Sequence, residues 1–194
     1  MTGSLFEPSL PLGFVYRDSF ITRDEETSLV AHIAQVEFST FEMHGVAARR
    51  RVAFFGRSYD ASRIVVAPHL PSFLMPLRDR IAEWARLDPS AFVMALINEY
   101  PPGAPIGWHR DAPQYGIVGG VSLLSACRMK LRPYVSPGSR STTPRRSATH
   151  EIELAPRSAY LMIGEARQKY EHHIPPVDTL RYSITFRTAR ERAA

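Results

Sequence analysis

A short H-x-D motif and a distant pair of histidines constrain the fold of this chain more than any other feature. His109 and Asp111 are two positions apart, so on an extended strand both side chains point to the same face. His172 and His173 lie far downstream and would face opposite sides of an extended chain, so at most one of them is expected to meet the motif. Two imidazoles and one carboxylate form the facial triad that holds Fe(II) and leaves open positions for other ligands. A fold that satisfies this pattern must bring two strands that are remote in sequence side by side.

The composition is typical of one globular domain. The chain has 194 residues, of which 44% are hydrophobic and 22% are charged, which is ordinary for a well-cored domain. It has no apolar run long enough to cross a membrane, and residues 1–11 lack the pattern of a signal peptide. The single cysteine, Cys127, excludes an internal disulfide and suits a reducing compartment. We therefore expect a single domain over residues 1–194 that is cytoplasmic and monomeric and has no membrane partner.

The order of apolar patterns predicts an α+β fold that is mainly β, with N-terminal helices on one face. Thr22 and Glu25 give a capping-box signature before an amphipathic helix that reaches Val36, and a second helix is expected from Pro71 or Ser72 to Leu87. The expected strands are Phe14–Tyr16, Phe92–Tyr100, Ile117–Val118, Val121–Val135, Glu151–Leu154, Ser158–Ile163, His172–Ile174 and Arg181–Thr188. Short strands with turn residues between them favour a sandwich or a barrel-like jelly roll. The polar segment Ser136–Thr149 is expected to be a mobile loop between two strands.

The last expected strand carries two arginines that suit an anionic ligand. Arg181 and Arg187 are six positions apart, so both project from one face of a regular strand. Two buried cations on one face are costly unless an anion neutralises them, and a small dicarboxylate such as 2-oxoglutarate would do so by bidentate contact. Asn98 and Tyr100 share a face of the strand before the H-x-D motif and can donate hydrogen bonds to the same ligand. The alternative is an exposed strand with two unrelated arginines, a capping asparagine and a core tyrosine.

Three segments of the chain resemble AlkB-type dioxygenases. Residues 98–111 resemble the N-x-Y-x-x-G…H-x-D region of that family, and residues 181–187 (RYSITFR) resemble its closing R-Y-[NS]-[IL]-T-F-R strand. Residues 171–175 (EHHIP) are similar to its segment with the distal ligand, with His172 in the ligand place. The similarity covers roughly residues 92–188, the expected catalytic core, and implies a double-stranded β-helix (jelly roll).

The resemblance also implies cofactors and a reaction. Fe(II) would be bound by His109, Asp111 and His172, and the cosubstrate 2-oxoglutarate by Asn98, Tyr100, Arg181 and Arg187. With O₂, the family hydroxylates alkyl groups on nitrogen, and the product falls apart into an aldehyde and the unmodified base. Members commonly have a second acidic residue two positions after the iron-binding aspartate, whereas this chain has Pro113 there, followed by Gln114.

The segment before the strand core, about residues 38–68, corresponds to the family's lid over the substrate base. Aromatic side chains for stacking and arginines for phosphates suit a flipped-out base. The expected substrate-binding residues are Arg49, Arg50, Arg51, Phe54, Phe55, Tyr59 and Trp108. The alternative for this segment is a core strand with a basic exposed face.

The net charge allows a nucleic-acid partner without requiring one. The formal charge is +5, from 24 Lys and Arg against 19 Asp and Glu, and the sequence pI is about 9.7. Such a charge fits a polyanionic partner as well as it fits an ordinary solvated surface. We expect oxidative dealkylation of alkylated DNA or of RNA such as tRNA. One alternative is an oxygenase that acts on protein side chains. Another is a binding module with a vestigial site, but the intact set of ligands argues against that module.

Overall fold

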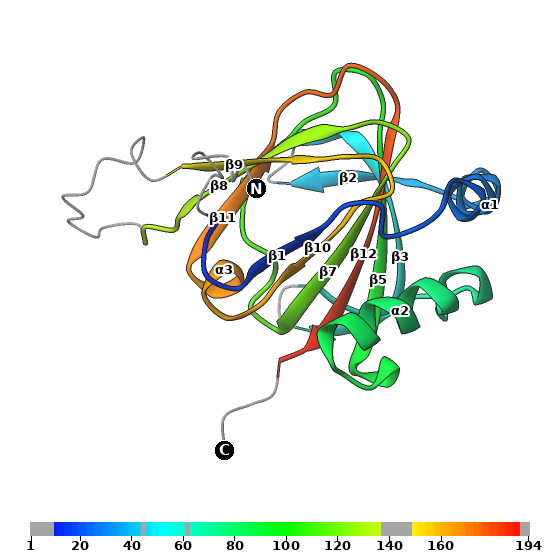
Figure 1. Cartoon of the computed structure of the whole chain (residues 1–194), viewed down its shortest axis with the longest axis horizontal. Coiled ribbons are helices and arrows are strands. Elements are labelled where there is room, and N and C mark those ends of the chain that lie inside the picture. The colour runs from blue at the N-terminus through cyan, green and yellow to red at the C-terminus, as the bar shows by residue number, and fades with distance from the viewer. Residues whose placement is uncertain (1–9, 44–45, 61–62, 137–148, 191–194) are drawn as a thin grey trace, which may run out of the picture.

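The computed structural model describes residues 10–43, 46–60, 63–136 and 149–190, which form two antiparallel sheets and a few helices (Figure 1). The strands of the larger sheet are β1 (Phe14–Arg17), β2 (Ser39–Met43), β3 (Val46–Asp60), β4 (Arg63–Val66), β5 (Phe92–Tyr100), β7 (Tyr115–Leu123), β10 (Ala159–Met162) and β12 (Arg181–Ala189). The smaller sheet contains β6 (Ile106–His109), β8 (Cys127–Pro133), β9 (His150–Leu154) and β11 (Tyr170–Ile174). The helices are α1 (Arg23–Ile33), α2 (Met75–Ala85) and α3 (Gly164–Gln168), with 3₁₀ turns η1 (Ser72–Leu74) and η2 (Pro89–Ala91).

The two sheets pack face to face as a jelly roll, as the strand pattern predicts. The larger sheet has the order β1-β10-β7-β12-β5-β3-β2, with β4 paired to β3, and the smaller has the order β6-β11-β8-β9. One buried cluster joins them, because Val118 and Met162 of the larger sheet pack with Met129 and Leu131 of the smaller one. No helix in the described part of the chain is long and apolar enough to cross a membrane.

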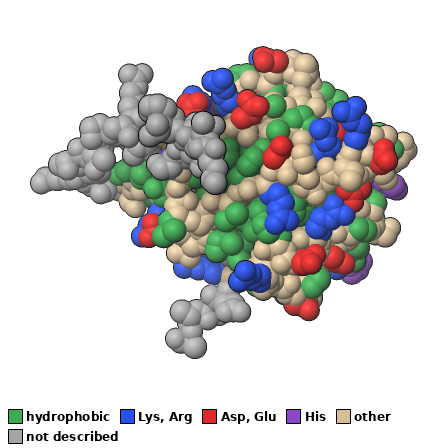
Figure 2. Space-filling view, in the orientation of Figure 1, with side chains coloured by type: hydrophobic (Ala, Val, Ile, Leu, Met, Phe, Trp, Pro, Cys, Tyr) green, Lys and Arg blue, Asp and Glu red, His purple; other side chains and the backbone are tan. Residues whose placement is uncertain are grey.

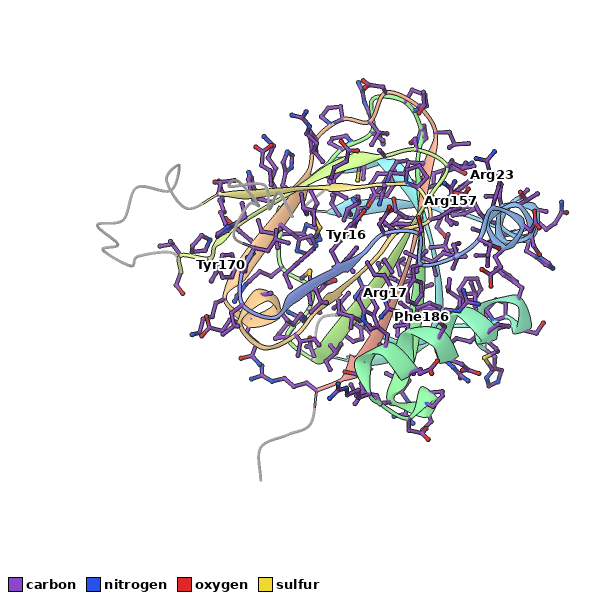
Figure 3. The ribbon with its side chains drawn as sticks, in the orientation of Figure 1. Tyr16, Arg17, Arg23, Arg157, Tyr170 and Phe186 are labelled. Carbon is purple, nitrogen blue, oxygen red and sulfur yellow. The ribbon has the colours of Figure 1, made fainter. Side chains whose placement is uncertain are left out.

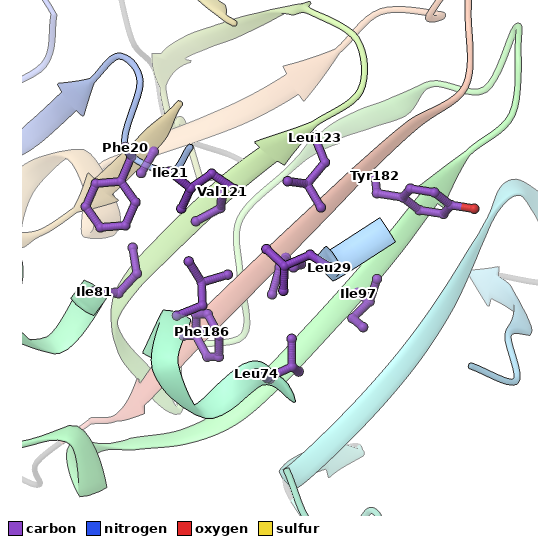
Figure 4. Packing of buried hydrophobic residues seen from close by; sticks show 14 of the residues in the cluster. Phe20, Ile21, Leu29, Leu74, Ile81, Ile97, Val121, Leu123, Tyr182 and Phe186 are labelled. Carbon is purple, nitrogen blue, oxygen red and sulfur yellow. The ribbon is translucent and has the colours of Figure 1, made fainter. Parts of the chain in front are cut away.

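The N-terminal helices cover the outer face of the larger sheet, as expected. Ile33 of α1 and Ile81 of α2 are fully buried with Ile184 and Phe186 of β12, in the main hydrophobic cluster (Figure 4). Burial of each such side chain contributes roughly 1.5–3 kcal/mol. Gly119 of β7 permits the close approach of α2, because a Cβ atom there would lie 2.6 Å from Cγ2 of Ile81.

Polar contacts fix α1 at its start and along its side. The predicted capping box is present: the Thr22 hydroxyl accepts from the Glu25 backbone at 3.2 Å, and the Glu25 carboxylate accepts from the Thr22 backbone at 2.7 Å. Arg157, in the turn between β9 and β10, reaches the helix and pairs with Glu26 at 3.0 Å (Figure 3). Acidic and basic side chains are interspersed over the face of the molecule shown in Figure 2, so this face is not a continuous basic surface.

Some strand boundaries differ from the expectation. The run Val121–Val135 is two strands, because the chain turns at Leu124, which has a φ of +70° and is exposed. The lid-like segment, residues 38–68, contributes β2, β3 and β4 to the larger sheet, and β3 pairs with β5 from Arg51↔Glu99 to Gly56↔Met94. That segment is therefore an extension of the sheet. For residues 137–148, the expected loop lies outside the described part of the chain.

Candidate active site

His109 and His172 face each other across neighbouring strands of the smaller sheet. The two residues are register partners in the β6–β11 ladder, and their ring centroids are 4.2 Å apart. Nδ1 of His109 lies 2.9 Å from the Gly107 carbonyl oxygen. Because a carbonyl can only accept, Nδ1 carries the proton and the Nε2 lone pair remains for a ligand. Nδ1 of His172 is buried and has no hydrogen-bond partner in the described part of the chain.

Asp111 joins the two histidines from outside the strand. β6 ends at His109, so Asp111 arrives through the segment that follows the strand; the expectation that strand alternation would align the two side chains was wrong in this respect. Its Oδ1 accepts from Nε of Arg187 at 2.9 Å and from Nη2 at 2.6 Å. Among the described residues no three His, Cys, Asp or Glu side chains form a preassembled metal cluster. The carboxylate of Asp111 is instead engaged with Arg187.

The electrostatics of the site favour the protonation states that metal binding requires. Burial, with a smaller contribution from the nearby His109, lowers the pKa of His172 from 6.5 to about 3. Burial also lowers the pKa of His109. Burial alone would raise the pKa of Asp111, but the charge of Arg187, joined by the histidines when they are protonated at low pH, outweighs burial and holds that pKa below its usual range. At neutral pH the site therefore offers two neutral imidazoles and one carboxylate, the forms that bind a metal ion.

The structure separates His173 and Trp108 from this site. Nδ1 of His173 donates to the Ile106 carbonyl at 2.7 Å, and the His173 ring stacks on Trp108 with centroids 5.1 Å apart. Arg132 lies over the same indole, 4.0 Å from its centroid. Strand alternation thus brings His172, and not its neighbour, to His109. Trp108, expected among the substrate-binding residues, does not line the cavity that contains the histidines.

The face of β12 that carries Arg181 and Arg187 looks into the same cavity. Ser183 and Thr185 also line it, while Tyr182, Ile184 and Phe186 pack under the helices, as the alternation predicts. Arg181 is only 1% exposed, and its Nε donates to Ser122 Oγ at 3.1 Å. Its Nη1 is buried without a hydrogen-bond partner among the described residues. A buried guanidinium with an unused donor fits a residue that receives a carboxylate.

Asn98 and Tyr100 lie beside Arg181 on β5. Tyr100 is the register partner of Arg181, whose guanidinium carbon lies 5.0 Å from the phenol ring centroid. The Asn98 amide donates to Ser183 Oγ at 3.5 Å and accepts from Nε of Arg50 at 3.4 Å. Both residues are buried and line the cavity. The four residues expected to bind 2-oxoglutarate are therefore brought together.

The cavity has a volume of about 280 Å³ and is closed on one side by β3. The basic and aromatic residues of β3 divide between its two faces. Arg50 and Phe54 line the cavity. Arg51 lies on the other face, where its Nε and Nη2 donate to the Glu99 carboxylate at 2.8 and 2.9 Å. Phe55 packs against the helix-covered core.

Arg49 and Tyr59 complete the expected substrate-binding set, and Arg49 is not among the residues that line the cavity. Arg49 is exposed, with Nη1 3.3 Å from the position that a Cβ atom would take at Gly103. The side chain of Tyr59 lies outside the described part of the chain.

The structure adds two residues that the sequence did not single out. Arg167 in α3 is buried, and its Nη2 donates to the carbonyls of Ala112 at 2.7 Å and Tyr115 at 3.0 Å, which holds the segment that carries Asp111. Nothing in the local sequence distinguishes this arginine from a surface residue of a short helix. Tyr160 lies across Gly120, where a Cβ atom would overlap its ring, and burial raises its pKa so that the phenol stays neutral. Alternation along β10 could have placed Tyr160 on the inner face.

A jelly roll that gathers two histidines, a carboxylate and two buried arginines around one cavity defines a non-haem, metal-dependent oxygenase. Residues 18–187 match the 2OG-Fe(II) oxygenase superfamily, and the chain belongs to this family. Its cofactors are therefore Fe(II) and 2-oxoglutarate, with O₂, and the enzyme class is an Fe(II)/2-oxoglutarate-dependent dioxygenase. The donor set described above fits both groups.

Known proteins of similar sequence and structure agree with the AlkB-type resemblance. The alkylated DNA repair protein ALKBH8 homolog of Arabidopsis thaliana is 29% identical over 206 residues, which cover 95% of this chain and 57% of the relative. The chain thus spans a little over half the length of this curated relative. The structure of OsALKBH1 superposes with a TM-score of 0.70 at 14% identity, over 92% of this chain and 99% of that chain. A Pseudomonas putida prolyl-4-hydroxylase has a TM-score of 0.61 at 14% identity, over 93% and 94%. At such identities the two structures share the fold.

Proposed function

We propose that this chain oxidatively removes alkyl groups from nitrogen atoms of bases in nucleic acid. One observation carries the proposal: a single cavity of about 280 Å³ contains both the histidine–aspartate group and the buried arginines, and Arg50 and Phe54 form part of its wall. An aromatic surface and a cation beside the reactive centre suit a base attached to a phosphate backbone. The similarity to a relative named as an alkylated DNA repair protein supports the same substrate class.

In this proposal the polar residues of the cavity divide into two groups. His109, Asp111 and His172 hold Fe(II), since their protonation states are those of ligands. Arg181 receives one carboxylate of 2-oxoglutarate, and Asn98 and Tyr100 donate hydrogen bonds to the same molecule. When bound, iron, 2-oxoglutarate and O₂ would together supply the oxidising power for hydroxylation of the carbon attached to nitrogen, and the hydroxylated carbon would leave as an aldehyde.

Arg187, expected from the sequence to bind 2-oxoglutarate, in this proposal instead positions the carboxylate of Asp111. Its guanidinium is held by Thr185 Oγ1 at 2.9 Å as well as by Asp111, and Asp111 raises its pKa against the opposing effect of burial. The Arg187 guanidinium therefore stays charged and keeps the Asp111 carboxylate ionised beside the histidines.

The apolar part of the cavity would receive the alkylated base. Val52 and Phe54 from β3 and Met94 and Leu96 from β5 line it. These side chains offer a surface for stacking and exclude water from the alkyl carbon. Flipping a base out of a stack costs a few kcal/mol, which contacts on such a surface offset.

Nucleoside mass spectrometry tests the proposal. The purified protein is incubated with Fe(II), 2-oxoglutarate and methylated single-stranded DNA, duplex DNA or bulk tRNA, and the loss of methylated nucleosides is measured together with formaldehyde. We expect loss from at least one nucleic acid and no loss with His109→Ala. His69→Ala is the matched control, because His69 is exposed and does not line the cavity, and this variant should retain activity.

The same experiment separates the two substrate classes. If every methylated nucleoside persists while 2-oxoglutarate is still consumed with a peptide library, the proposal fails in favour of an oxygenase that acts on protein side chains. Hydroxylated peptides would then be detected as mass shifts of one oxygen atom.

A further inference from the structure

A second cavity, of about 520 Å³, lies directly beside the active-site cavity. It is bounded by the start of β7, by α3 and by the residue that follows β12. Arg110, Asp111, Ala112 and Tyr115 line both cavities, so the two spaces share a wall. A ligand long enough to enter both would pass the metal-binding carboxylate on its way.

Three arginines line the second cavity: Arg110, Arg167 and Arg190. Among the described residues that line it, Asp111 is the sole carboxylate, and its Oδ1 is engaged by Arg187 on the side of the active site. The cavity therefore has an excess of positive charge.

Contacts with the fold hold two of these arginines in place. Arg167 is 6% exposed and donates from Nη2 to the backbone carbonyls of the segment after His109, while its Nε is buried without a partner among the described residues. Arg110 lies 3.5 Å from the centroid of the Tyr134 ring and donates from Nη1 to the Gln168 carbonyl at 3.3 Å. Guanidinium groups that are ordered before a ligand arrives lose less conformational freedom on binding.

The third arginine completes the cluster from the far end of the chain. The Arg190 backbone donates to the Gln114 carbonyl at 2.8 Å, which fixes the point where its side chain starts, and the side chain is exposed. Burial lowers the pKa of Arg167, the Asp111 carboxylate raises it, and the charges of Arg187, Arg110 and Arg190 lower it, so Arg110 and Arg190 each repel Arg167. A bound anion would relieve that repulsion.

We propose that the cavity lined by Arg110, Arg167 and Arg190 binds a backbone phosphate of the polynucleotide whose target base enters the adjacent active site. The inference rests on the proposed function and adds a second contact point for its substrate. Guanidinium groups match the geometry of phosphate oxygens, and phosphate contacts set the register of a nucleic acid on a protein. The 2-oxoglutarate carboxylates have their own cation in Arg181, which does not line this cavity.

The salt dependence of binding tests the subsite without requiring turnover. The affinity of the protein for a short fluorescent single-stranded DNA, and for RNA of the same sequence, is measured by anisotropy over a range of salt concentrations. We expect Arg190→Gln to weaken binding several-fold at about 0.1 M salt and to reduce the slope of log K against log salt by about one. Arg190→Lys, which keeps the charge, should keep the slope, and Arg190→Glu should weaken binding more than Arg190→Gln.

A matched charge change elsewhere gives the control. Arg128 is exposed on β8 and does not line this cavity, so Arg128→Gln should bind as the wild type does. If Arg190→Gln and Arg190→Glu retain the wild-type slope while the wild type binds oligonucleotide and removes its methyl groups, the subsite is refuted and the proposed function stands. If the wild type neither binds nor demethylates any oligonucleotide, the proposed function fails and the subsite fails with it.

A competition experiment distinguishes a phosphate within a polynucleotide from a free phosphate. Inorganic phosphate and a mononucleotide are added to the wild-type complex with the labelled oligonucleotide. A site for a phosphodiester within a longer chain predicts weak competition by both, because inorganic phosphate lacks the base and a mononucleotide cannot place its base in the active site and a neighbouring backbone phosphate in this cavity at once. Full displacement by inorganic phosphate at sub-millimolar concentration would overturn the assignment to a polynucleotide.

Discussion

Replacement of Arg181 by methionine separates a ligand-binding role from a structural one. The residue is 1% exposed, and its partners among the described residues are Ser122 Oγ and the ring of Tyr100. If its guanidinium makes two charge-assisted hydrogen bonds to a carboxylate of 2-oxoglutarate, each contributes about 1.5–3 kcal/mol. Their sum of roughly 3–6 kcal/mol corresponds to a rise in the Kd for 2-oxoglutarate of about a hundredfold to ten-thousandfold.

Stability should respond differently from binding in this variant. Replacing a buried ionic group by an apolar side chain of similar length is often neutral or stabilising by about 1–4 kcal/mol, because no charge is left uncompensated. The free energy of unfolding of Arg181→Met without cosubstrate is therefore expected to equal or exceed that of the wild type. By contrast, Arg187→Met leaves the Asp111 carboxylate buried without its ion-pair partner and is expected to cost about 3–5 kcal/mol.

Denaturation with and without cosubstrate measures both effects. At a 2-oxoglutarate concentration of about 100 Kd, the wild type should gain about 2.7 kcal/mol of stability, and Arg181→Met should gain almost none at the same concentration. Arg128→Met provides a control at an exposed arginine outside the cavity. A Kd for 2-oxoglutarate within threefold of the wild-type value, or a large loss of stability without the cosubstrate, would refute the reasoning.

Three further predictions concern the histidines and the packing of α2. His172→Gln should eliminate iron binding measured by metal content, whereas His173→Gln should retain it; the reverse result would exchange the two assignments. In metal-free buffer, the low pKa of His172, about 3 against 6.5 in the unfolded chain, means that the unfolded state binds the proton first as pH falls. The free energy of unfolding should therefore decrease by on the order of 4 kcal/mol between pH 6.5 and pH 3, with no contribution from this group above pH 6.5, and His172→Gln should remove this part of the pH dependence in chemical denaturation. Gly119→Ala should cost about 1–3 kcal/mol because the new Cβ meets Cγ2 of Ile81, and Ile81→Ala, which removes that atom, should make the loss in the double variant smaller than the sum of the two single losses in a double-mutant cycle; strictly additive effects would contradict the contact.

The parts of the site that follow strand periodicity were predictable from the sequence. Arg181 and Arg187 face the cavity because six is an even number of residues on a strand. The same rule, applied to the basic run of β3, would have assigned Arg50 to the cavity and Arg51 to the opposite face, where it pairs with Glu99. Likewise, Trp108 precedes His109 by one position and therefore could have been placed on the other side of the sheet.

The parts that depend on irregular backbone were not predictable. Asp111 lies beyond the end of β6, and the path that returns its carboxylate to the site depends on carbonyl contacts with Arg167, more than fifty residues later in the chain. Secondary-structure propensities depend on neighbouring residues and cannot predict a contact between residues so far apart in sequence. The second cavity was not predictable for the same reason, since its arginines Arg110, Arg167 and Arg190 come from three segments that are distant in sequence.

The direct pairing of His109 with His172 across β6 and β11 makes the candidate metal site a consequence of strand register. Slipping either strand by one residue would turn its histidine to the other face, so a single insertion or deletion within residues 106–109 or 170–174 should abolish the site, however conservative its composition. Ile174 and Ile106, which pair beyond a register shift in the same ladder, are both buried in one hydrophobic cluster. The hydrophobic packing that prevents such a slip therefore also keeps the two imidazoles opposite each other. Mutational scanning should find that both isoleucines tolerate replacement by other apolar residues better than replacement by polar residues.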